Sequence, residues 1–366
     1  MATAATAQGG DDGGMNELKA LTGARGIAAW WVVLFHLRGS MGALHPAIES
    51  AIAKGYLAVD FFFLLSGFVI WLSWGQRFRE RGFAEAGRFL WKRMARIWPL
   101  HLFVLACAVV LAVVLAASGR NIDRFPFADL PLHIVLLQSW GFVEPLAWND
   151  PAWSISAESA AYLLFPVLAV TIDWRRMPSW ALVAVVAVLL FGLLPFAGQD
   201  GLGVDLRRFA VARCVIQFAA GTAIGALWVQ WRQRDAIAGA AVVLAGALVV
   251  GWGLRLLPEP YALPPALACL LLACAILSNR RSNPLEWWPI HRLGEISYAT
   301  YLGHFLLWFV FKLVFVADAA VAPLWVLALY VVAVIVSSEV LYRVVERPAQ
   351  GWVNRLWERR RVAVEI

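Results

Sequence analysis

Residues 18–38, LKALTGARGIAAWWVVLFHLR, decide how the rest of the chain is interpreted. The segment is apolar and long enough to cross a lipid bilayer as a helix, yet it contains Arg25 and His36. Charged or titratable side chains at membrane depth cost free energy, so their presence indicates function. Eleven residues separate the two, which places both side chains on one helix face, about 16 Å apart along the axis. The sequence therefore predicts a cation and an imidazole at two depths of one membrane helix.

The composition extends this interpretation to the whole chain. Of the 366 residues, 61% are hydrophobic and only 15% are charged, which is typical of a polytopic membrane protein. We predict an all-α bundle of ten transmembrane helices, at residues 18–38, 56–75, 97–117, 152–172, 179–197, 208–230, 236–256, 262–278, 294–316 and 322–342. The apolar segment 130–142 is too short to cross and is expected to be a re-entrant or interfacial piece.

The ends of the chain differ in composition from this bundle. Residues 1–15 are small, polar and glycine-rich, which predicts a disordered tail, and translation could begin at Met15 instead of Met1. We assign residues 16–348 to one membrane domain and residues 349–366 to a basic cytoplasmic tail.

Basic residues in the connections set the predicted topology. Twenty-one Lys and Arg residues fall on the side of segment 76–96 and of the C-terminal tail, against seven on the other side. Because cytoplasmic loops accumulate Lys and Arg, both termini are expected to be cytoplasmic. The net charge of +7 then follows from membrane topology, and no nucleic-acid partner is expected.

This topology predicts a layer of titratable residues near the outer surface. The first helix runs outward, so Arg25 lies in its cytoplasmic half and His36 near its outer end. Asp60 is about one turn, and Glu158 about two turns, from the outer end of their helices, so both can share a layer with His36. Asp60 has a second interpretation, as the ion-pair partner of a buried cation.

Two helices carry polar residues at helical spacing. Ser154, Glu158 and Tyr162 form one stripe, and a second stripe consists of Ser297, Tyr301 and His304. Such stripes must face protein or water in a bilayer. A purely structural alternative remains open, in which Ser297 and Tyr301 simply satisfy a packed His304.

Common cofactor motifs are missing from the sequence. It has no Walker loop, dinucleotide fingerprint or Gly-x-Ser-x-Gly elbow, and its four Cys residues lack metal-ligand spacing. We expect neither a metal site nor a permanently bound cofactor.

Six blocks, in order along the chain, resemble the integral-membrane acyltransferase-3 family of sugar and antibiotic O-acyltransferases. Each block alone is weak evidence for this resemblance, but the occurrence of all six in the family's order is specific. They are Arg25 with His36, Val59-Asp60-Phe61-Phe62 with Leu65-Ser66-Gly67-Phe68, Lys92-Arg93-Met94-Ala95-Arg96-Ile97-Trp98-Pro99, Trp153-Ser154-Ile155 with Glu158, Ser297-Tyr298 with Tyr301-Leu302 and His304, and Glu346-Arg347-Pro348.

The resemblance implies a multi-pass enzyme of the bacterial inner membrane that moves an acyl group, usually acetyl, from cytoplasmic acyl-coenzyme A to a hydroxyl. Arg25, Arg93 and Arg96 are the expected donor-binding residues, since arginine pairs phosphate bidentately. For Arg93 and Arg96, plain membrane topology is the alternative.

Histidine can take a proton from the acceptor hydroxyl, so His36 is the expected general base or a transient acyl carrier. Asp60 or Glu158 is expected to orient its ring and to share the catalytic site. The remaining candidates for substrate binding or structure are Ser154, Tyr298, Tyr301 and His304. Oxyanion donors are expected among Arg25, Tyr298 and Tyr301.

The expected acceptor is a carbohydrate, such as an exopolysaccharide or surface glycan precursor, with polysaccharide assembly proteins as candidate partners beside the lipid bilayer. A glycosylated antibiotic or a lipid-linked sugar is the alternative acceptor. Two alternatives of other classes are a proton-coupled transporter, whose histidines and carboxylates would relay protons, and a non-catalytic scaffold of a polysaccharide synthase.

Overall fold

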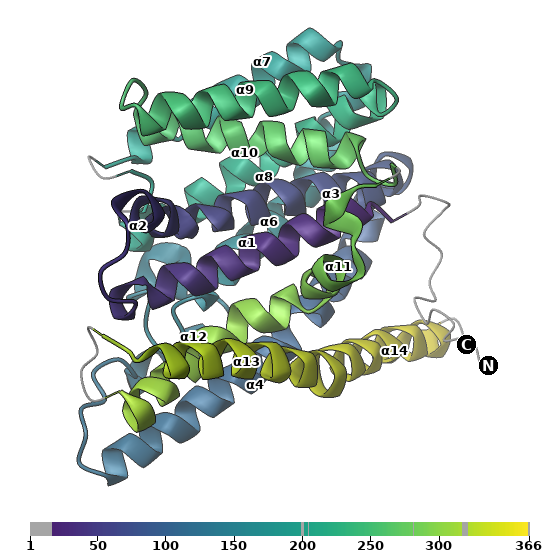
Figure 1. The fold of residues 1–366 in the computed structure, drawn as a ribbon. Coiled ribbons are helices and arrows are strands. Elements are labelled where there is room, and N and C mark those ends of the chain that lie inside the picture. Colours follow the sequence, from purple (N-terminus) through teal and green to yellow (C-terminus); the bar gives the residue numbers. More distant parts are fainter. Residues whose placement is uncertain (1–16, 199–200, 204, 281, 317–320, 365–366) are drawn as a thin grey trace, which may run out of the picture.

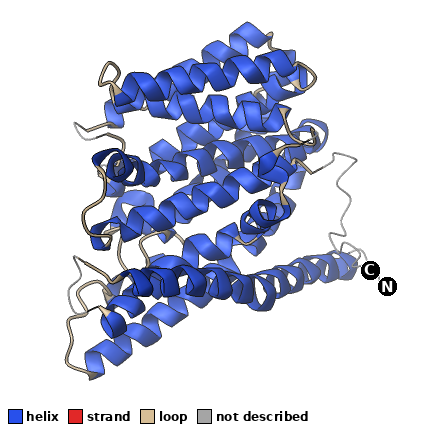
Figure 2. Ribbon diagram, viewed as in Figure 1, coloured by secondary structure: helices blue, strands red, loops and turns tan. Residues whose placement is uncertain are grey.

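The computed structural model describes residues 17–198, 201–203, 205–280, 282–316 and 321–364. The tail expected at residues 1–15 lies outside them. Within the described ranges the chain is helical, and no strand is present (Figures 1 and 2). The helices are α1 (Lys19–Leu37), α2 (Pro46–Ala53), α3 (Ala58–Arg81), α4 (Ala86–Ala117), α5 (Leu130–Ile134), α6 (Ala152–Thr171), α7 (Ser179–Phe191), α8 (Leu206–Trp231), α9 (Asp235–Gly253), α10 (Glu259–Ile276), α11 (Trp288–Glu295), α12 (Ser297–Phe315), α13 (Leu324–Val340) and α14 (Arg347–Val364).

The predicted polytopic helical bundle is confirmed. Nine stretches of the described residues are long and apolar enough to cross a membrane. One of them, Pro46–Ala117, contains both α3 and α4. Each of the ten expected segments therefore corresponds to a helix.

The basic connection between the second and third expected segments is mostly helical. The helix α3 continues to Arg81 and α4 already begins at Ala86, with a break at Gly82, where φ is 59°. Arg, Lys, Glu and Ala favour helix, so these two helices continue beyond their apolar segments. A run of basic residues thus lines the first turns of α4.

The basic C-terminal segment is also helical. A π-helical turn at Leu341–Glu346 joins α13 to α14, and α14 lies against the first part of α4 (Figure 1). In the same view α1 begins and α14 ends at the same end of the bundle (Figure 1).

The helices α1, α3, α6 and α8 form the centre of the bundle. A Cβ at Gly67 would lie 1.9 Å from the carbonyl oxygen of Phe218, and one at Gly221 would lie 2.0 Å from that of Leu64. Small residues allow membrane helices to approach this closely, so α3 and α8 pack backbone to backbone. The helices α7, α9 and α10 cover one side of this centre, and α4, α12 and α13 lie on the other (Figure 1).

The segment 130–142 does not cross the bundle. It contains the short α5 and a π-helical turn at Gln138–Phe142. Gln138 donates to the carbonyl of Ala152 at 3.2 Å, and the Ser139 hydroxyl donates to that of Trp153 at 2.8 Å. These buried hydrogen bonds fix the segment against the start of α6, where non-helical backbone is buried in protein.

Candidate active site

Two histidines meet where α1 approaches α12. The Nδ1 atom of His36 lies 3.0 Å from Nε2 of His304. The two helices run in the same direction, because Arg25 contacts Ser297 near their beginnings and the histidines meet further along. His304 is 1% exposed, whereas His36 is only partly buried. The predicted polar stripe of α12, which contains His304, therefore faces α1, the helix that carries His36.

Nearby backbone carbonyls indicate which ring nitrogens of His36 and His304 carry a hydrogen. Nδ1 of His304 lies 3.0 Å from the carbonyl oxygen of Thr300, and Nδ1 of His36 lies 3.0 Å from that of Val32. A carbonyl only accepts, so in neutral rings both Nδ1 atoms carry the hydrogen. The single Nδ1 hydrogen of His36 is then shared between the Val32 carbonyl and Nε2 of His304, as a three-centre hydrogen bond. This arrangement leaves Nε2 of His36 with a lone pair, as a general base requires.

Asp60 does not contact His36. Its carboxylate accepts two hydrogen bonds from Arg213 of α8, at 2.8 and 2.5 Å, and a third from Gln217. Asp60, Arg213 and Gln217 are 0%, 3% and 0% exposed, and Arg213 also donates to the carbonyl of Leu202 at 2.9 Å. Of the two interpretations of Asp60, this geometry matches the ion-pair partner of a buried cation.

Glu158 also lies apart from His36. It accepts hydrogen bonds from Ser66 of α3 and from Tyr162 one turn along α6, and the cations whose charge it senses are Arg93 and Arg96. His36, Asp60 and Glu158 therefore each have their own hydrogen-bond partners, and among the described residues no hydrogen bond joins one of the three to another. The ring that contacts His36 is that of His304, which the sequence left with an open role.

Arg25 connects α1 to the junction of α11 and α12. Its Nε donates to the Ser297 hydroxyl at 2.8 Å and to the carbonyl of Gly294 at 3.2 Å, and its Nη2 donates to the same carbonyl at 2.7 Å. A Cβ at Gly294 would lie 1.8 Å from the carbonyl oxygen of Thr22, so α11 packs directly on α1. Arg25 thus links α1 to the beginning of α12, and these two helices carry His36 and His304.

Arg96 and Tyr298 have defined partners near Arg25. Arg96 forms an ion pair with Glu346, which is 2% exposed, and its guanidinium lies 5.3 Å from the Tyr298 ring centroid. The Tyr298 hydroxyl donates to the carbonyl of Ile97 at 2.5 Å. Its hydrogen is therefore committed to α4 and does not point to a reacting group.

The two predicted polar stripes contact each other through Ser154 and Tyr301, whose hydroxyl oxygens lie 2.8 Å apart. The Ser154 hydroxyl also lies 3.1 Å from the carbonyl of Pro151, to which it must donate. Tyr301 is then the donor to Ser154. Of the three expected oxyanion donors, Tyr298 and Tyr301 thus have their hydroxyl hydrogens engaged.

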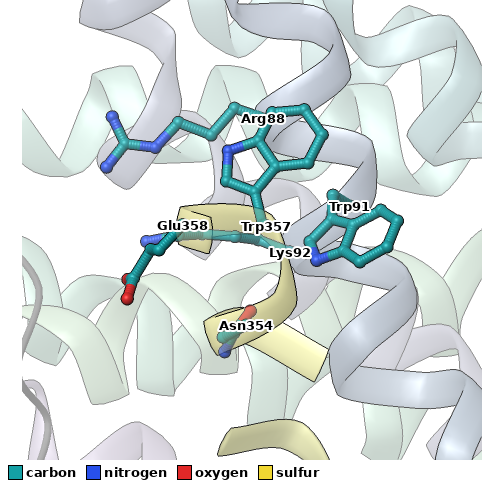
Figure 3. Close-up of a pocket in the computed structure, with 6 residues that line it drawn as sticks. All are labelled: Arg88, Trp91, Lys92, Asn354, Trp357 and Glu358. Carbon is teal, nitrogen blue, oxygen red and sulfur yellow. The ribbon is translucent and has the colours of Figure 1, made fainter. Parts of the chain in front are cut away.

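A pocket opens between α4 and α14, at the end of the bundle where α1 begins (Figures 1 and 3). The Trp91 and Trp357 ring centroids lie 5.5 Å apart with the ring planes tilted by 36°, and Trp91 donates to the carbonyl of Val353 at 3.0 Å. The buried Oδ1 of Asn354 and Nε1 of Trp357 have no hydrogen-bond partner among the described residues. The residues that line the pocket are Arg88, Trp91, Lys92, Asn354, Trp357 and Glu358.

The described residues bring no group of three or more His, Cys, Asp or Glu side chains together for a metal. Arg213, in contrast, is a site-adjacent residue that the sequence interpretation missed. It falls within the expected helix 208–230, and the signal that singled out Arg25, a cation at membrane depth, applies equally to it. The second interpretation of Asp60, as the ion-pair partner of a buried cation, did not name Arg213 as that cation.

Comparisons with known proteins match most of the chain. A protein-family model described as an acyltransferase domain matches residues 18–343, which leaves α14 outside the match. Acyltransferase MdmB of Streptomyces mycarofaciens is 30% identical over 377 aligned residues, which cover 92% of this chain and 93% of that protein.

Two further relatives match over shorter stretches. Protein 2 in the picA locus of Rhizobium radiobacter is 38% identical over 99 residues, or 27% of this chain and 48% of that protein. A Staphylococcus aureus (strain COL) protein with the provisional name of an O-acetyltransferase is 25% identical over 167 residues, or 43% of this chain and 26% of its own length. No solved structure gives a significant match.

Proposed function

The chain belongs to the acyltransferase-3 family, and we propose that it transfers an acetyl group from cytoplasmic acetyl-coenzyme A to a carbohydrate hydroxyl at the outer face of a bacterial inner membrane. The observation that carries this proposal is the contact between His36 and His304, whose Nδ1 atoms both lie 3.0 Å from a backbone carbonyl oxygen; the neutral tautomer that this geometry favours keeps Nε2 of His36 as a proton acceptor.

The chemistry follows from that nitrogen. Nε2 of His36 takes the proton of the acceptor hydroxyl while the hydroxyl oxygen attacks the thioester carbonyl carbon. The carbon–sulfur bond then breaks, and the departing thiolate takes the proton back from the imidazolium. His304 stabilises this imidazolium by accepting from Nδ1 of His36, a role that a carboxylate has in other acyl-transfer sites.

The same nitrogen also supports an acyl-histidine route, in which Nε2 of His36 attacks the thioester first and the hydroxyl attacks second. Rapid denaturation at neutral pH of the enzyme with labelled donor alone distinguishes the two routes, because an acylimidazole hydrolyses quickly in acid. Label that remains on wild-type protein and is lost in His36→Ala indicates the covalent route.

Basic side chains on α4 support a donor site at the opposite end of α1. Arg88, Lys92 and Arg96 recur at four-residue spacing and therefore share one helix face. The first two line the α4–α14 pocket, where they suit the phosphates of coenzyme A. The thin pantetheine arm then passes Arg96 and Arg25 towards His36, over the roughly 16 Å that eleven helical residues span.

The test uses the full chain in lipid nanodiscs, acetyl-labelled coenzyme A and a glycan extract from cells that lack the gene. We expect His36→Ala to lose transfer by about 10²- to 10⁴-fold, and Arg93→Ala with Arg96→Ala to raise the KM of the donor more than it lowers kcat. His45→Asn is the matched control, because His45 only caps α2.

Undiminished transfer by His36→Ala would refute the catalytic assignment, and an unchanged donor KM in the double arginine variant would assign both arginines to topology. Glycosylated antibiotics and lipid-linked sugars, offered in place of the extract, test the alternative acceptors.

A further inference from the structure

The ring of His36 lies between two phenylalanine rings, and an arginine guanidinium packs against each of these rings. The Phe35 and Phe305 ring centroids are both 5.1 Å from that of His36, in edge-on geometry. The Arg38 guanidinium lies 3.8 Å from the Phe35 centroid, and that of Arg124 lies 5.1 Å from the Phe305 centroid. Both arginines are close enough for their charge to act on His36.

The charges around this site do not balance. Arg124 forms an ion pair with Asp150, and Lys312 lies within electrostatic range of both. Arg38 donates to the carbonyl of Phe35 at 2.5 Å and pairs with no carboxylate among the described residues. Burial raises the pKa of Asp150 above its ordinary value, while Arg124 lowers it. Among the described residues, which exclude 317–320, Asp150 therefore offsets at most one of these three positive charges.

This surplus lies on the side where basic residues are scarce. Arg38 and Arg124 are two of the seven Lys and Arg residues in the connections predicted to face outward, and positive charge is disfavoured in short translocated loops. Arg38 is exposed, and the Arg124 side chain is 44% exposed. Both can therefore reach a ligand that approaches His36 from outside.

A neighbouring acceptor atom is also unsatisfied. Asn149 is 3% exposed, and its Nδ2 donates to the carbonyl of Leu302 at 3.0 Å, two residues before His304. Its Oδ1 is buried without a partner among the described residues. A buried acceptor left unpaired costs free energy, which a hydrogen bond from a buried water would remove.

We infer that the acceptor is an anionic carbohydrate, whose carboxylate or phosphate pairs with Arg38 and Arg124 beside His36. This inference rests on the proposed function, because it assumes that the acceptor reaches His36 from the outer side. The negative group would place a nearby hydroxyl at Nε2 of His36, since arginine binds carboxylate and phosphate in fixed, bidentate geometry.

The test offers one glycan extract in three forms to the full chain in nanodiscs with labelled acetyl-coenzyme A. One portion is untreated, one has its uronic carboxylates reduced to alcohols, and one has its phosphate esters removed. We expect one of the two treatments to lower labelling about tenfold, which identifies the anionic group as carboxylate or phosphate. Equal labelling of all three portions would overturn the inference and leave the proposed function intact.

A charge-neutral variant sharpens this result. Arg38→Gln should lose about tenfold in kcat/KM, mostly through KM, on the untreated extract, and at most about twofold on the neutralised one. Arg208→Gln, which changes an outer arginine elsewhere, is the control and should behave as wild type on both. Equal losses on the two extracts, expressed in kcat, would instead assign Arg38 to the chemical step.

Failure of the proposed function gives a different pattern. If no portion of the extract is labelled, the carbohydrate acceptor itself is wrong, and the inference falls with it.

Discussion

Two polar clusters lie within the apolar bundle, and they differ in charge pairing and in exposure. Asp60, Arg213 and Gln217 are almost fully buried, and the Asp60 carboxylate accepts three hydrogen bonds. The His36–His304 pair is partly exposed and leaves one ring nitrogen without a donor. A fully buried, charge-paired cluster in a membrane protein holds helices together, whereas a partly exposed pair with a free acceptor nitrogen can react.

The two clusters are close neighbours. The Arg213 guanidinium lies 5.7 Å from the Tyr56 ring centroid. The Tyr56 and Phe35 ring centroids are 5.9 Å apart, and the Phe35 ring contacts His36. Two aromatic rings therefore separate the ion pair from the histidine. Proximity alone does not distinguish the roles of the two clusters. Variants of their residues are needed to do so.

The largest effect is expected from breaking the ion pair. Asp60→Ala leaves Arg213 buried without its partner, which should cost about 3–5 kcal/mol in the free energy of unfolding. Thermal or denaturant unfolding in detergent micelles measures this loss. Replacing both partners, with Asp60→Leu and Arg213→Met, should restore most of the stability, because no uncompensated charge remains. An equally unstable double variant would contradict a purely structural ion pair.

A smaller effect is expected from the second histidine. His304→Phe removes the group that accepts from Nδ1 of His36, and kcat should fall by about 10- to 100-fold with little change in the acceptor KM. His304→Gln keeps an amide oxygen for this hydrogen bond and should recover part of the loss. Equal kcat values for His304→Phe and His304→Gln would show that His304 acts by packing alone.

The smallest effect is expected from Tyr301→Phe. This change removes the hydroxyl that donates to Ser154, and it should cost about 1 kcal/mol of stability. Since that hydrogen is already engaged, we expect kcat to stay within about twofold of wild type. A loss of 10²-fold or more would make Tyr301 an oxyanion donor.

The fold could be predicted because hydrophobicity in lipid is a local signal. Ten apolar segments identified ten helices, and only their ends moved, where basic side chains extended α3 and α4 past the apolar region. The close packing of α3 on α8 follows from Gly67 and Gly221 only once both helices are placed. Sequence position alone does not reveal that contact.

The site could be predicted only in part, because partners come from distant helices. The spacing of Arg25 and His36 identified the correct helix face, and the stripe on α12 identified the helix that meets it. The depth of a residue along its helix, however, does not show which neighbouring helix its side chain faces. Asp60 had two interpretations, as the partner of His36 or of a buried cation, and the structure pairs it with Arg213 of α8.

One comparison of activities tests the central distinction most directly. Acetyl transfer is measured for His36→Ala and for the Asp60→Leu, Arg213→Met double variant, each first shown to be folded by its unfolding midpoint. We predict that the histidine variant is folded and inactive, and that the double variant retains activity within about tenfold of wild type. An active His36→Ala beside an inactive, folded double variant would reverse the two roles and contradict the account.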